Sequence, residues 1–280
     1  MKLIADSGST KTIWMEVESG CKVVTEGLNP RFTTDEQFLA ACATVRQQFS
    51  ILNSQFSIYF YGAGCGDQRQ RDRVASLLTA FFRPDSVSVE TDMLGACRAV
   101  SGRRASIVAI LGTGSNVCYY DGTVIRCQPT STGYIMGDNG SANHVGRILL
   151  NDYLTQRMPE EMRALFYETY QMSDSELMDA VYHRPNANRF LASLAPFAVQ
   201  HVADDYCAGV IKEALYDWYH GPLTTLRQRV GLGEGEINFV GGFAKAIEPL
   251  LRNYLADDTL TVGTVLADPI EGLRSFHRIS

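Results

Sequence analysis

Two glycine-hydroxyl turns organise this sequence: Asp6-Ser7-Gly8-Ser9-Thr10-Lys11-Thr12 and Gly112-Thr113-Gly114-Ser115-Asn116. Each turn follows a short apolar run and leads into another, a pattern typical of a β-hairpin. Glycine lets backbone N–H groups approach an anion closely, and the hydroxyls supply further donors. Either turn alone would be typical of an ordinary hairpin loop. Together, with an acidic residue beside the first, they indicate two hairpins that grip one polyphosphate.

The predicted elements form a pattern that starts twice. Three strands open the chain, helices and strands then alternate, and a second set of three strands begins near Arg104. The predicted strands are 2–5, 13–17, 22–26, 56–61, 87–91, 106–111, 117–121, 123–127 and 236–240. Helices are predicted at 67–82, 93–100, 141–155, 159–170, 196–219 and 269–278. One further helix is predicted from a Thr33/Glu36 capping box to Phe49, and another after Gly242 through Tyr254. This order predicts an α/β protein with an internal duplication of fold.

Composition narrows the class of protein. With 280 residues the chain can form two domains, and 45% hydrophobic with 20% charged residues is typical of a globular protein. The formal charge of -6 argues against nucleic acid or an anionic membrane as the main partner. No charged-then-apolar leader is found and no apolar stretch approaches about 18 residues, so we expect a cytoplasmic protein. The seven cysteines are scattered, which favours reduced thiols over a metal site.

Several strings beyond the two turns carry a resemblance to a known family. They are Gly27-Leu28-Asn29-Pro30, Thr91-Asp92-Met93-Leu94-Gly95-Ala96, Gly133-Tyr134-Ile135-Met136-Gly137-Asp138-Asn139-Gly140-Ser141 and Gly241-Gly242. In this order, with the two hairpins, they resemble the actin, Hsp70 and sugar kinase superfamily. Within it the chain is similar to the BadF/BadG/BcrA/BcrD ATPase family and its N-acetylglucosamine kinase-like branch. The resemblance spans nearly the whole chain.

The resemblance implies a two-lobed ribonuclease H-like (actin-like ATPase) fold, each lobe a mixed β-sheet with flanking helices. The N-terminal actin-like ATPase lobe is expected at 1–104 plus 266–280, and the C-terminal lobe at 105–265. ATP with Mg²⁺ would lie between the lobes, with the sugar deeper. The implied activity is an ATP-dependent kinase that transfers the γ-phosphate to a sugar hydroxyl, with an amino sugar such as N-acetylglucosamine as the leading acceptor.

The phosphate-binding and metal-binding residues follow from the same strings. The ATP-binding residues are expected to be Gly8, Ser9, Thr10, Gly112, Thr113, Gly114, Gly241 and Gly242. Asp6, after the first strand, is the expected Mg²⁺ carboxylate, held through water as suits a cation that dehydrates reluctantly. An Asx turn is the structural alternative for Asp6, and a tight strand-to-helix connection is the alternative for the glycine pair.

Asp92 is the expected catalytic residue, because it lies where a strand ends and a helix begins, at the carboxyl edge of a sheet. Its carboxylate could accept the proton of a sugar hydroxyl as that hydroxyl attacks the γ-phosphate. N-capping of the following helix is the alternative role. The resemblance implies that the sugar is bound by Asn29, Asp92, Thr113, Tyr134 and Asp138.

Two residues depart from the family pattern. Ser7 replaces the commoner second glycine of the first turn, which bears on how closely the backbone approaches phosphate. Asn139 stands where the family usually has Glu, and the lost negative charge bears on the choice of sugar.

Two other functions stay open at this stage. One is a sugar-binding sensor that keeps the cleft with weak or no turnover; regulators of this superfamily usually add a DNA-binding helix-turn-helix, and this sequence begins at the first hairpin. The other is an ATPase that drives a partner protein, which in dehydratase-activating relatives needs an iron-sulfur cluster held by cysteines. The expected partner is a small-molecule sugar, and the family also allows a homodimer.

Overall fold

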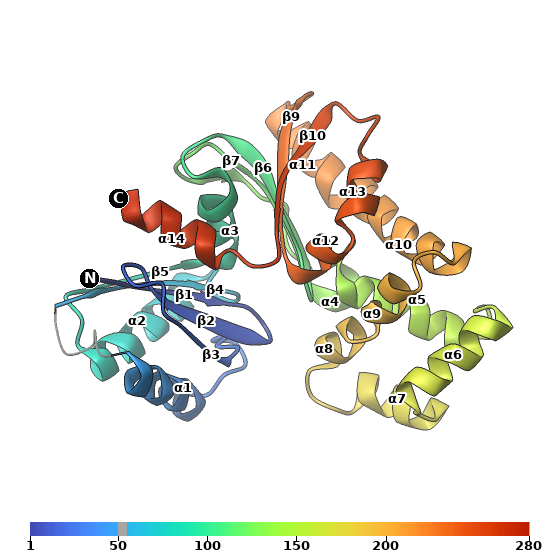
Figure 1. Cartoon of the computed structure of the whole chain (residues 1–280), viewed down its shortest axis with the longest axis horizontal. Helices are drawn as coiled ribbons and strands as arrows, with labels where there is room; N and C mark the ends of the chain where they lie inside the picture. The colour runs from blue at the N-terminus through green and yellow to red at the C-terminus, as the bar shows by residue number, and fades with distance from the viewer. Residues whose placement is uncertain (50–54, 280) are drawn as a thin grey trace. The chain divides into compact units, whose positions relative to one another are not determined.

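The computed structural model describes residues 1–49 and 55–279, which form two compact units (Figure 1). The first unit comprises Met1–Ser106, Tyr120–Ile125 and the C-terminal segment from Asp268, and the second comprises Ile107–Tyr119 and Arg126–Ala267. Residues 50–54 and Ser280, which the predicted N-terminal lobe includes, lie outside the described residues. The chain therefore passes between the units several times, and its last helix belongs with its first strands.

The first unit is built on a five-stranded mixed sheet of strand order β3-β2-β1-β4-β5. Its strands are β1 (Lys2–Ser7), β2 (Lys11–Glu16), β3 (Lys22–Glu26), β4 (Ser57–Gly62) and β5 (Ser86–Thr91). The β1–β2 and β2–β3 pairs are antiparallel, whereas β1–β4 and β4–β5 are parallel. Because β1, β4 and β5 run in the same direction, their carboxyl ends meet at one edge of the sheet.

Helices cover both faces of this sheet (Figure 1). They are α1 (Asp35–Gln48), α2 (Gln68–Phe82), α3 (Asp92–Ser101) and α14 (Ile270–Ile279). Alternation along β1 divides the core, because Leu3 packs in the cluster beneath α1 and α2, whereas Ile4 packs in the cluster with Leu273 of α14. The predicted Thr33/Glu36 capping box is wrong by one residue: Thr34 caps α1 and Gln37 completes the box.

The second unit repeats this topology, with a five-stranded sheet of order β10-β9-β6-β7-β8. Its strands are β6 (Ser106–Leu111), β7 (Ser115–Tyr120), β8 (Ile125–Cys127), β9 (Gly235–Val240) and β10 (Leu260–Leu266). Taken in sequence order within each unit, the five strands occupy the same places in both sheets. The predicted fold class and its internal duplication are therefore confirmed, whereas β10 is a strand that the sequence did not predict.

The helices of the second unit pack around one large apolar cluster. They are α4 (Gly133–Met136), α5 (Ala142–Leu154), α6 (Glu160–Tyr170), α7 (Asp174–Tyr182), α8 (Ala187–Ala192), α9 (Ala195–Gln200), α10 (Asp205–Trp218), the π-helical turn η2 (Tyr219–Leu223), α11 (Thr224–Val230), α12 (Gly242–Ala246) and α13 (Glu248–Tyr254). Among the residues described, no helix is long and apolar enough to cross a membrane.

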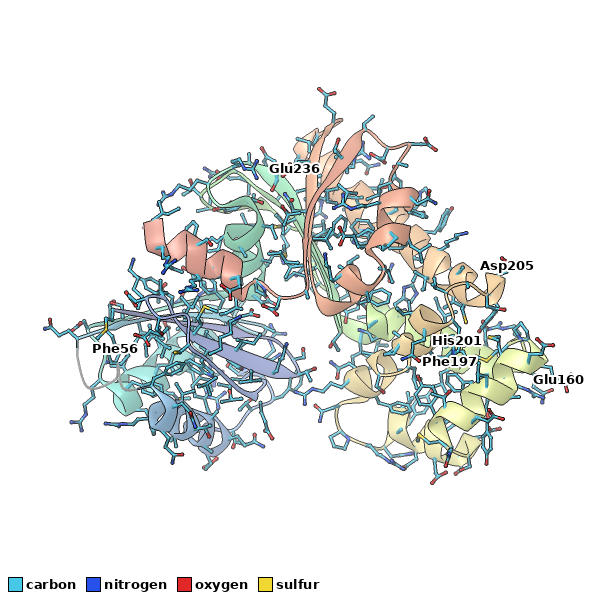
Figure 2. All side chains as sticks on the ribbon, viewed as in Figure 1. Phe56, Glu160, Phe197, His201, Asp205 and Glu236 are labelled. Carbon is cyan, nitrogen blue, oxygen red and sulfur yellow. The ribbon has the colours of Figure 1, made fainter. Side chains whose placement is uncertain are left out.

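The helix predicted over 196–219 is wrong, because the structure breaks it in two. Figure 2 labels Phe197 and His201 before the break and Asp205 after it. The His201 ring packs 4.9 Å from that of Phe197, centroid to centroid, at the end of α9. Asp204 then starts α10, since its carboxylate accepts the N–H groups of Tyr206 and Cys207. A new N-cap therefore ends the continuous apolar spacing that predicted a single helix.

Candidate active site

Three carboxylates gather at the carboxyl edge of the first sheet. Asp6 is the second-to-last residue of β1, Asp92 directly follows β5, and Asp268 lies two residues before α14. Asp6 and Asp92 are half-buried, and both Asp92 and Asp268 act electrostatically on Asp6. The parallel β1–β4–β5 arrangement accounts for the first two, because it brings the ends of β1 and β5 to one edge. Asp268 comes from the far end of the chain, and the sequence did not predict it as part of the site.

Burial and like charge together disfavour ionisation of Asp6. Desolvation is the larger cause, the carboxylates of Asp92 and Asp268 add repulsion, and the ammonium of Lys11 offsets part of it; the pKa of Asp6 rises to about 7. Burial likewise raises the pKa of Asp92, opposed by hydrogen bonds from backbone N–H groups. A cation bound here would relieve the repulsion at Asp6.

Asp92 is not the N-cap of its helix. Thr91 takes that place, because its Oγ1 accepts the N–H of Leu94 at 3.1 Å. Asp92 is instead the first residue of α3, where its Oδ1 accepts the N–H of Met93 at 2.9 Å. A carboxylate in the first helical turn is stabilised by the helix dipole and keeps lone pairs for a further partner.

The first hairpin is closed by its own backbone. The N–H of Gly8 donates to the carbonyl of Lys11 at 3.0 Å, and that of Gly27 donates to the carbonyl of Thr10 at 3.1 Å. Ser9 is half-buried and Thr10 is exposed at the tip. The N–H of Gly8 is thus already hydrogen-bonded within the turn, so a phosphate bound here would contact the residues that follow Gly8.

Ser7 has a structural role that glycine could not fill. Its buried Oγ lies 2.9 Å from Thr12 Oγ1 and accepts the N–H of Leu28 at 3.0 Å. These bonds join β1 to β2 and to the segment that carries Asn29. Asn29 Oδ1 accepts the N–H of Arg31 at 3.0 Å, and the side chain packs against Gly64, which has a positive φ. The Oδ1 atom of Asn29 therefore stabilises the turn that contains this residue.

The second hairpin is tied to the start of α5. The N–H of Gly112 closes the turn onto the carbonyl of Gly114 at 3.0 Å. The carbonyl of Gly112 accepts the N–H of Ala142, while that of Thr113 accepts both the backbone N–H and the side-chain amide of Asn143. These hydrogen bonds hold the turn against the start of α5. The tip of the turn is therefore the part that could contact a ligand.

Gly241 lies directly against this turn. It follows β9 with φ of 137°, and an added Cβ would clash with the carbonyl of Leu111 and lie 3.0 Å from the nitrogen of Gly112. An added Cβ on Gly242, the first residue of α12, would meet nothing within 4 Å. The structure thus brings the two predicted ATP-binding motifs of the second unit together, with Gly241 as the close contact.

A polar cavity of about 290 Å³ lies beside the same hairpin, within the second unit. Asp138 and Asn139 line it, together with Ser115 and Asn116 of β7. Among the predicted sugar residues of this unit, only Asp138 is part of the lining that the structure describes. Thr113 lies in the hairpin, and the ring of Tyr134, on α4, packs against the apolar core.

Asp138 is held in a strained conformation. Its φ is 53°, its Oδ1 accepts the N–H of Ser115 at 3.3 Å, and its Oδ2 accepts from Asn143 Nδ2 at 3.0 Å. Gly114 permits this contact, because an added Cβ there would come within 2.8 Å of Asp138 Oδ2. Neither Asn143 nor Arg229, which also lines the cavity, was predicted as a site residue. Asn143 is buried in a helix and Arg229 is far away in sequence, so no local pattern indicates either one.

Comparison with known structures places this arrangement in a class. A structure from Porphyromonas gingivalis named "Putative N-acetylglucosamine Kinase" matches with a TM-score of 0.92 and 32% identity, covering 100% of this chain and 99% of that one. One with the same name from Chromobacterium violaceum matches at a TM-score of 0.74 and 17% identity, covering 98% of each chain. A ROK family glucokinase from Streptomyces griseus, in complex with glucose and AMPPNP, matches at 0.51 and 14%, covering 100% and 98%.

Fold and sheet topology together define the fold class as that of the actin-like ATPases, which the matched sugar kinase structures share. Within this class, the chain belongs to the family of the Porphyromonas gingivalis protein, because the identity of 32% extends over both whole chains. No protein-family model matches the chain, and no curated protein does.

Proposed function

We propose that the protein is an ATP-dependent kinase that phosphorylates a hydroxyl of an amino sugar such as N-acetylglucosamine, as a member of the N-acetylglucosamine kinase-like branch of the BadF/BadG/BcrA/BcrD ATPases. The observation that carries the proposal is the pair Asp6 and Asp92 at one sheet edge. One carboxylate can serve a metal while the other serves as a base. The name of the 32% identical relative supports the amino sugar as acceptor.

Asp92 is the proposed general base. Its raised pKa brings the carboxyl closer to neutral pH, which favours acceptance of a proton from a sugar hydroxyl. Because Thr91 caps α3, Asp92 is not needed for capping. Phosphoryl transfer needs little more than an aligned nucleophile and stabilised charge, so a positioned carboxylate is sufficient on the protein's side.

The residues present fit a Mg²⁺ ion that is bound together with nucleotide. Within the described ranges, no group of three His, Cys, Asp or Glu side chains could hold a metal by itself. Mg²⁺ keeps several waters and is commonly bound through one or two carboxylates plus substrate phosphates. We propose that Asp6 supplies the carboxylate, where the ion would offset the repulsion from Asp92 and Asp268. When bound, the ion would neutralise charge on the transferred phosphoryl group.

ATP would be held by backbone rather than by cationic side chains. Ser9 and Thr10 are proposed to contact the phosphates in the first unit, and Gly112, Thr113 and Gly114 in the second. Gly241 and Gly242 would leave space for the adenosine. The sugar would be bound by Asn29 and Asp92 in one unit and by Thr113, Tyr134 and Asp138 in the other.

The test is ADP release with Mg²⁺ and ATP across hexoses, N-acetylhexosamines and cell-wall sugar fragments. We expect turnover with at least one amino sugar, and Asp92→Asn should lower kcat by roughly 10²- to 10⁴-fold. Asp85→Asn, on the loop before β5, is the matched control and should keep kcat. Turnover that persists in Asp92→Asn would remove Asp92 from the mechanism. The absence of ADP release with every sugar would refute the proposal that the protein is a kinase.

A further inference from the structure

The turn that follows β3 is closed by a residue that we propose to bind the sugar. The carbonyl of Asn29 accepts the N–H of Phe32 at 3.0 Å and that of Thr33 at 2.9 Å. The Oδ1 atom of the same residue accepts the N–H of Arg31. Asn29 thus closes the turn with both its backbone and its side chain. We call residues 29–33 the Asn29 turn.

Helix α2 also holds the Asn29 turn, through one guanidinium. Arg73 Nη1 donates to the carbonyl of Pro30 at 2.6 Å, and its Nη2 donates to that of Thr33 at 2.9 Å. Arg73 Nε donates to Asp35 Oδ1, at the start of α1, at 2.9 Å. A planar guanidinium with several donors can hold three acceptors in one arrangement. The protein's own contacts therefore fix the conformation of this turn.

Phe32 is exposed on this fixed turn. Its exposed fraction of 79% is the largest among the aromatic side chains that the structure describes, whereas Pro30 in the same turn is buried. Its ring belongs neither to the apolar cluster beneath α1 and α2 nor to the one with α14. Its neighbours Arg31 and Thr33 are polar, whereas a docking surface for a protein needs a contiguous apolar patch. A single apolar ring flanked by polar groups suits a small ligand with both kinds of surface.

The Asn29 turn lies against the sheet edge that carries Asp92. The Asn29 side chain packs on Gly64, in the loop after β4, where an added Cβ would overlap Asn29 Oδ1. Strand β4 lies between β1 and β5, so this loop lies at the same carboxyl edge. The next residue is Cys65, whose pKa is raised by burial to about 12, and the charge of Asp92 adds to the rise. A sugar bound by Asn29 and Asp92 would therefore have the turn beside it.

We propose that Phe32 packs against the C–H face of the acceptor sugar and is a further sugar-binding residue. The proposal rests on the proposed function, because it takes Asn29 and Asp92 as residues of the sugar site. A pyranose has hydroxyls around its rim and C–H bonds on its faces, so an aromatic ring can remove the apolar face from water. Asn29 Nδ2 can donate to a hydroxyl at the rim. Because the turn is already fixed, little conformational entropy is lost when it binds the sugar.

The first test places a fluorescent indole at this position. Phe32→Trp puts an indole in water, whereas Trp14 and Trp218 are fully buried. The ligand is the hexose or N-acetylhexosamine that binds the wild-type protein most tightly in calorimetry, which we expect to be N-acetylglucosamine. A saturable titration should shift the emission of Phe32→Trp to shorter wavelength, because stacking removes the indole from water. Val24→Trp, on β3 at a position that is 60% exposed, is the matched control and should respond no more than the wild-type protein.

The second test measures the contribution of the ring to affinity. Phe32→Ala should raise the calorimetric Kd of the same sugar by roughly 3- to 10-fold, as expected for partial burial of one aromatic ring. Phe32→Tyr keeps the ring and should keep the affinity, and so should the control Val24→Ala. The Tm of Phe32→Ala should match that of the wild-type protein, because the ring packs in neither core cluster of the first unit.

An emission of Phe32→Trp that changes no more than that of Val24→Trp, while the sugar binds, would overturn the proposal. So would an unchanged Kd in Phe32→Ala. ADP release separates these tests from that of the kinase. Both expected responses without ADP release on any sugar would leave the Phe32 contact standing and refute the kinase, whereas ADP release without the responses would refute only the Phe32 contact. If no sugar binds the wild-type protein, both proposals are refuted.

Discussion

Asp6 is held where its charge destabilises the fold in the absence of ligand. Its pKa rises from 3.8 to about 7, so between these pH values the folded state binds more protons than the unfolded state. The contribution of Asp6 to the free energy of unfolding therefore falls as pH rises through this window. Asp6→Asn removes this cost, and we expect the ligand-free protein to gain on the order of 2 kcal/mol at pH 8 and much less at pH 4, measured by urea unfolding.

The same variant should lose its response to nucleotide with metal. In the wild-type protein, Mg²⁺ with a non-hydrolysable ATP analogue should raise the Tm, and a chelator should reverse most of the rise. In Asp6→Asn the metal-dependent part should be absent. A wild-type rise in Tm that the chelator leaves intact would contradict the assignment of Asp6 to the metal.

Gly241 is the residue whose replacement has the clearest steric consequence. Gly241→Ala places a Cβ against the Leu111 carbonyl at a φ of 137°. We expect it to cost roughly 1–3 kcal/mol of stability and to weaken nucleotide binding. Gly242→Ala is the matched control for stability, because its Cβ would meet nothing within 4 Å. Thermal unfolding of both variants checks this, and equal Tm losses would show that the clash is relieved elsewhere.

At the scale of elements, buried His277 fixes helix α14 to the first sheet. Its Nε2 lies 2.8 Å from the hydroxyl of Tyr61, which also accepts from Arg98 Nη1 of α3 at 2.8 Å. Its carbonyl accepts from Lys2 Nζ at 2.7 Å, and its ring stacks on Tyr59 with the centroids 4.1 Å apart. The C-terminal helix thus contacts both β1 and the helix that Asp92 begins.

The pKa of His277 gives this contact a pH dependence. Burial, with the charges of Arg98 and Lys2, lowers it from 6.5 to about 4, so the unfolded state binds the extra proton between these values. The contribution of His277 to stability should therefore fall by up to about 3 kcal/mol as pH drops from 6.5 toward 4, opposite in sign to that of Asp6. His277→Gln should flatten that part of the profile in urea unfolding. An unchanged slope would assign the effect to His144, whose pKa is lowered in the same way.

The sequence predicted the elements that glycine and apolar periodicity mark, and missed those that tertiary contacts create. Both hairpins and most strands of the two sheets were predicted, because turn residues separate short apolar runs. Strand β10 was missed because Gly263 interrupts its alternation, and the register shifts between Val262 and Val265. The break after α9 was missed because both halves are apolar, and only the cap at Asp204 separates them.

The residues of the candidate site likewise include some that the sequence predicts and some that only tertiary packing brings into place. Asp6 and Asp92 could be predicted, because each ends a strand and strand ends meet at one edge. Asp268 lies at the same edge only because the chain returns to the first unit after nearly its whole length. Arg229 lines the cavity from α11, and this placement depends on packing that no local spacing encodes.

At the scale of the whole molecule, the first unit depends on the end of the chain. Ile270 and Leu273 of α14 are buried against Ile4 and Met15 of the first hairpin. A variant that ends at Ala267 should therefore unfold the first unit selectively. Hydrogen exchange should show lost protection in β1 and β2, while Leu149 and Ile211 in the core of the second unit stay protected. Equal loss in both units would mean that they unfold as one.

This return of the chain also sets an order of events during synthesis. A ribosome makes β1 and β2 long before α14, the helix that completes their core. The second unit, whose residues end at Ala267, has its whole sequence available before the first one does. The nascent chain must therefore carry an unfinished, apolar first sheet until α14 has been made, and the carboxylate edge with Asp6 and Asp92 takes its final form only then.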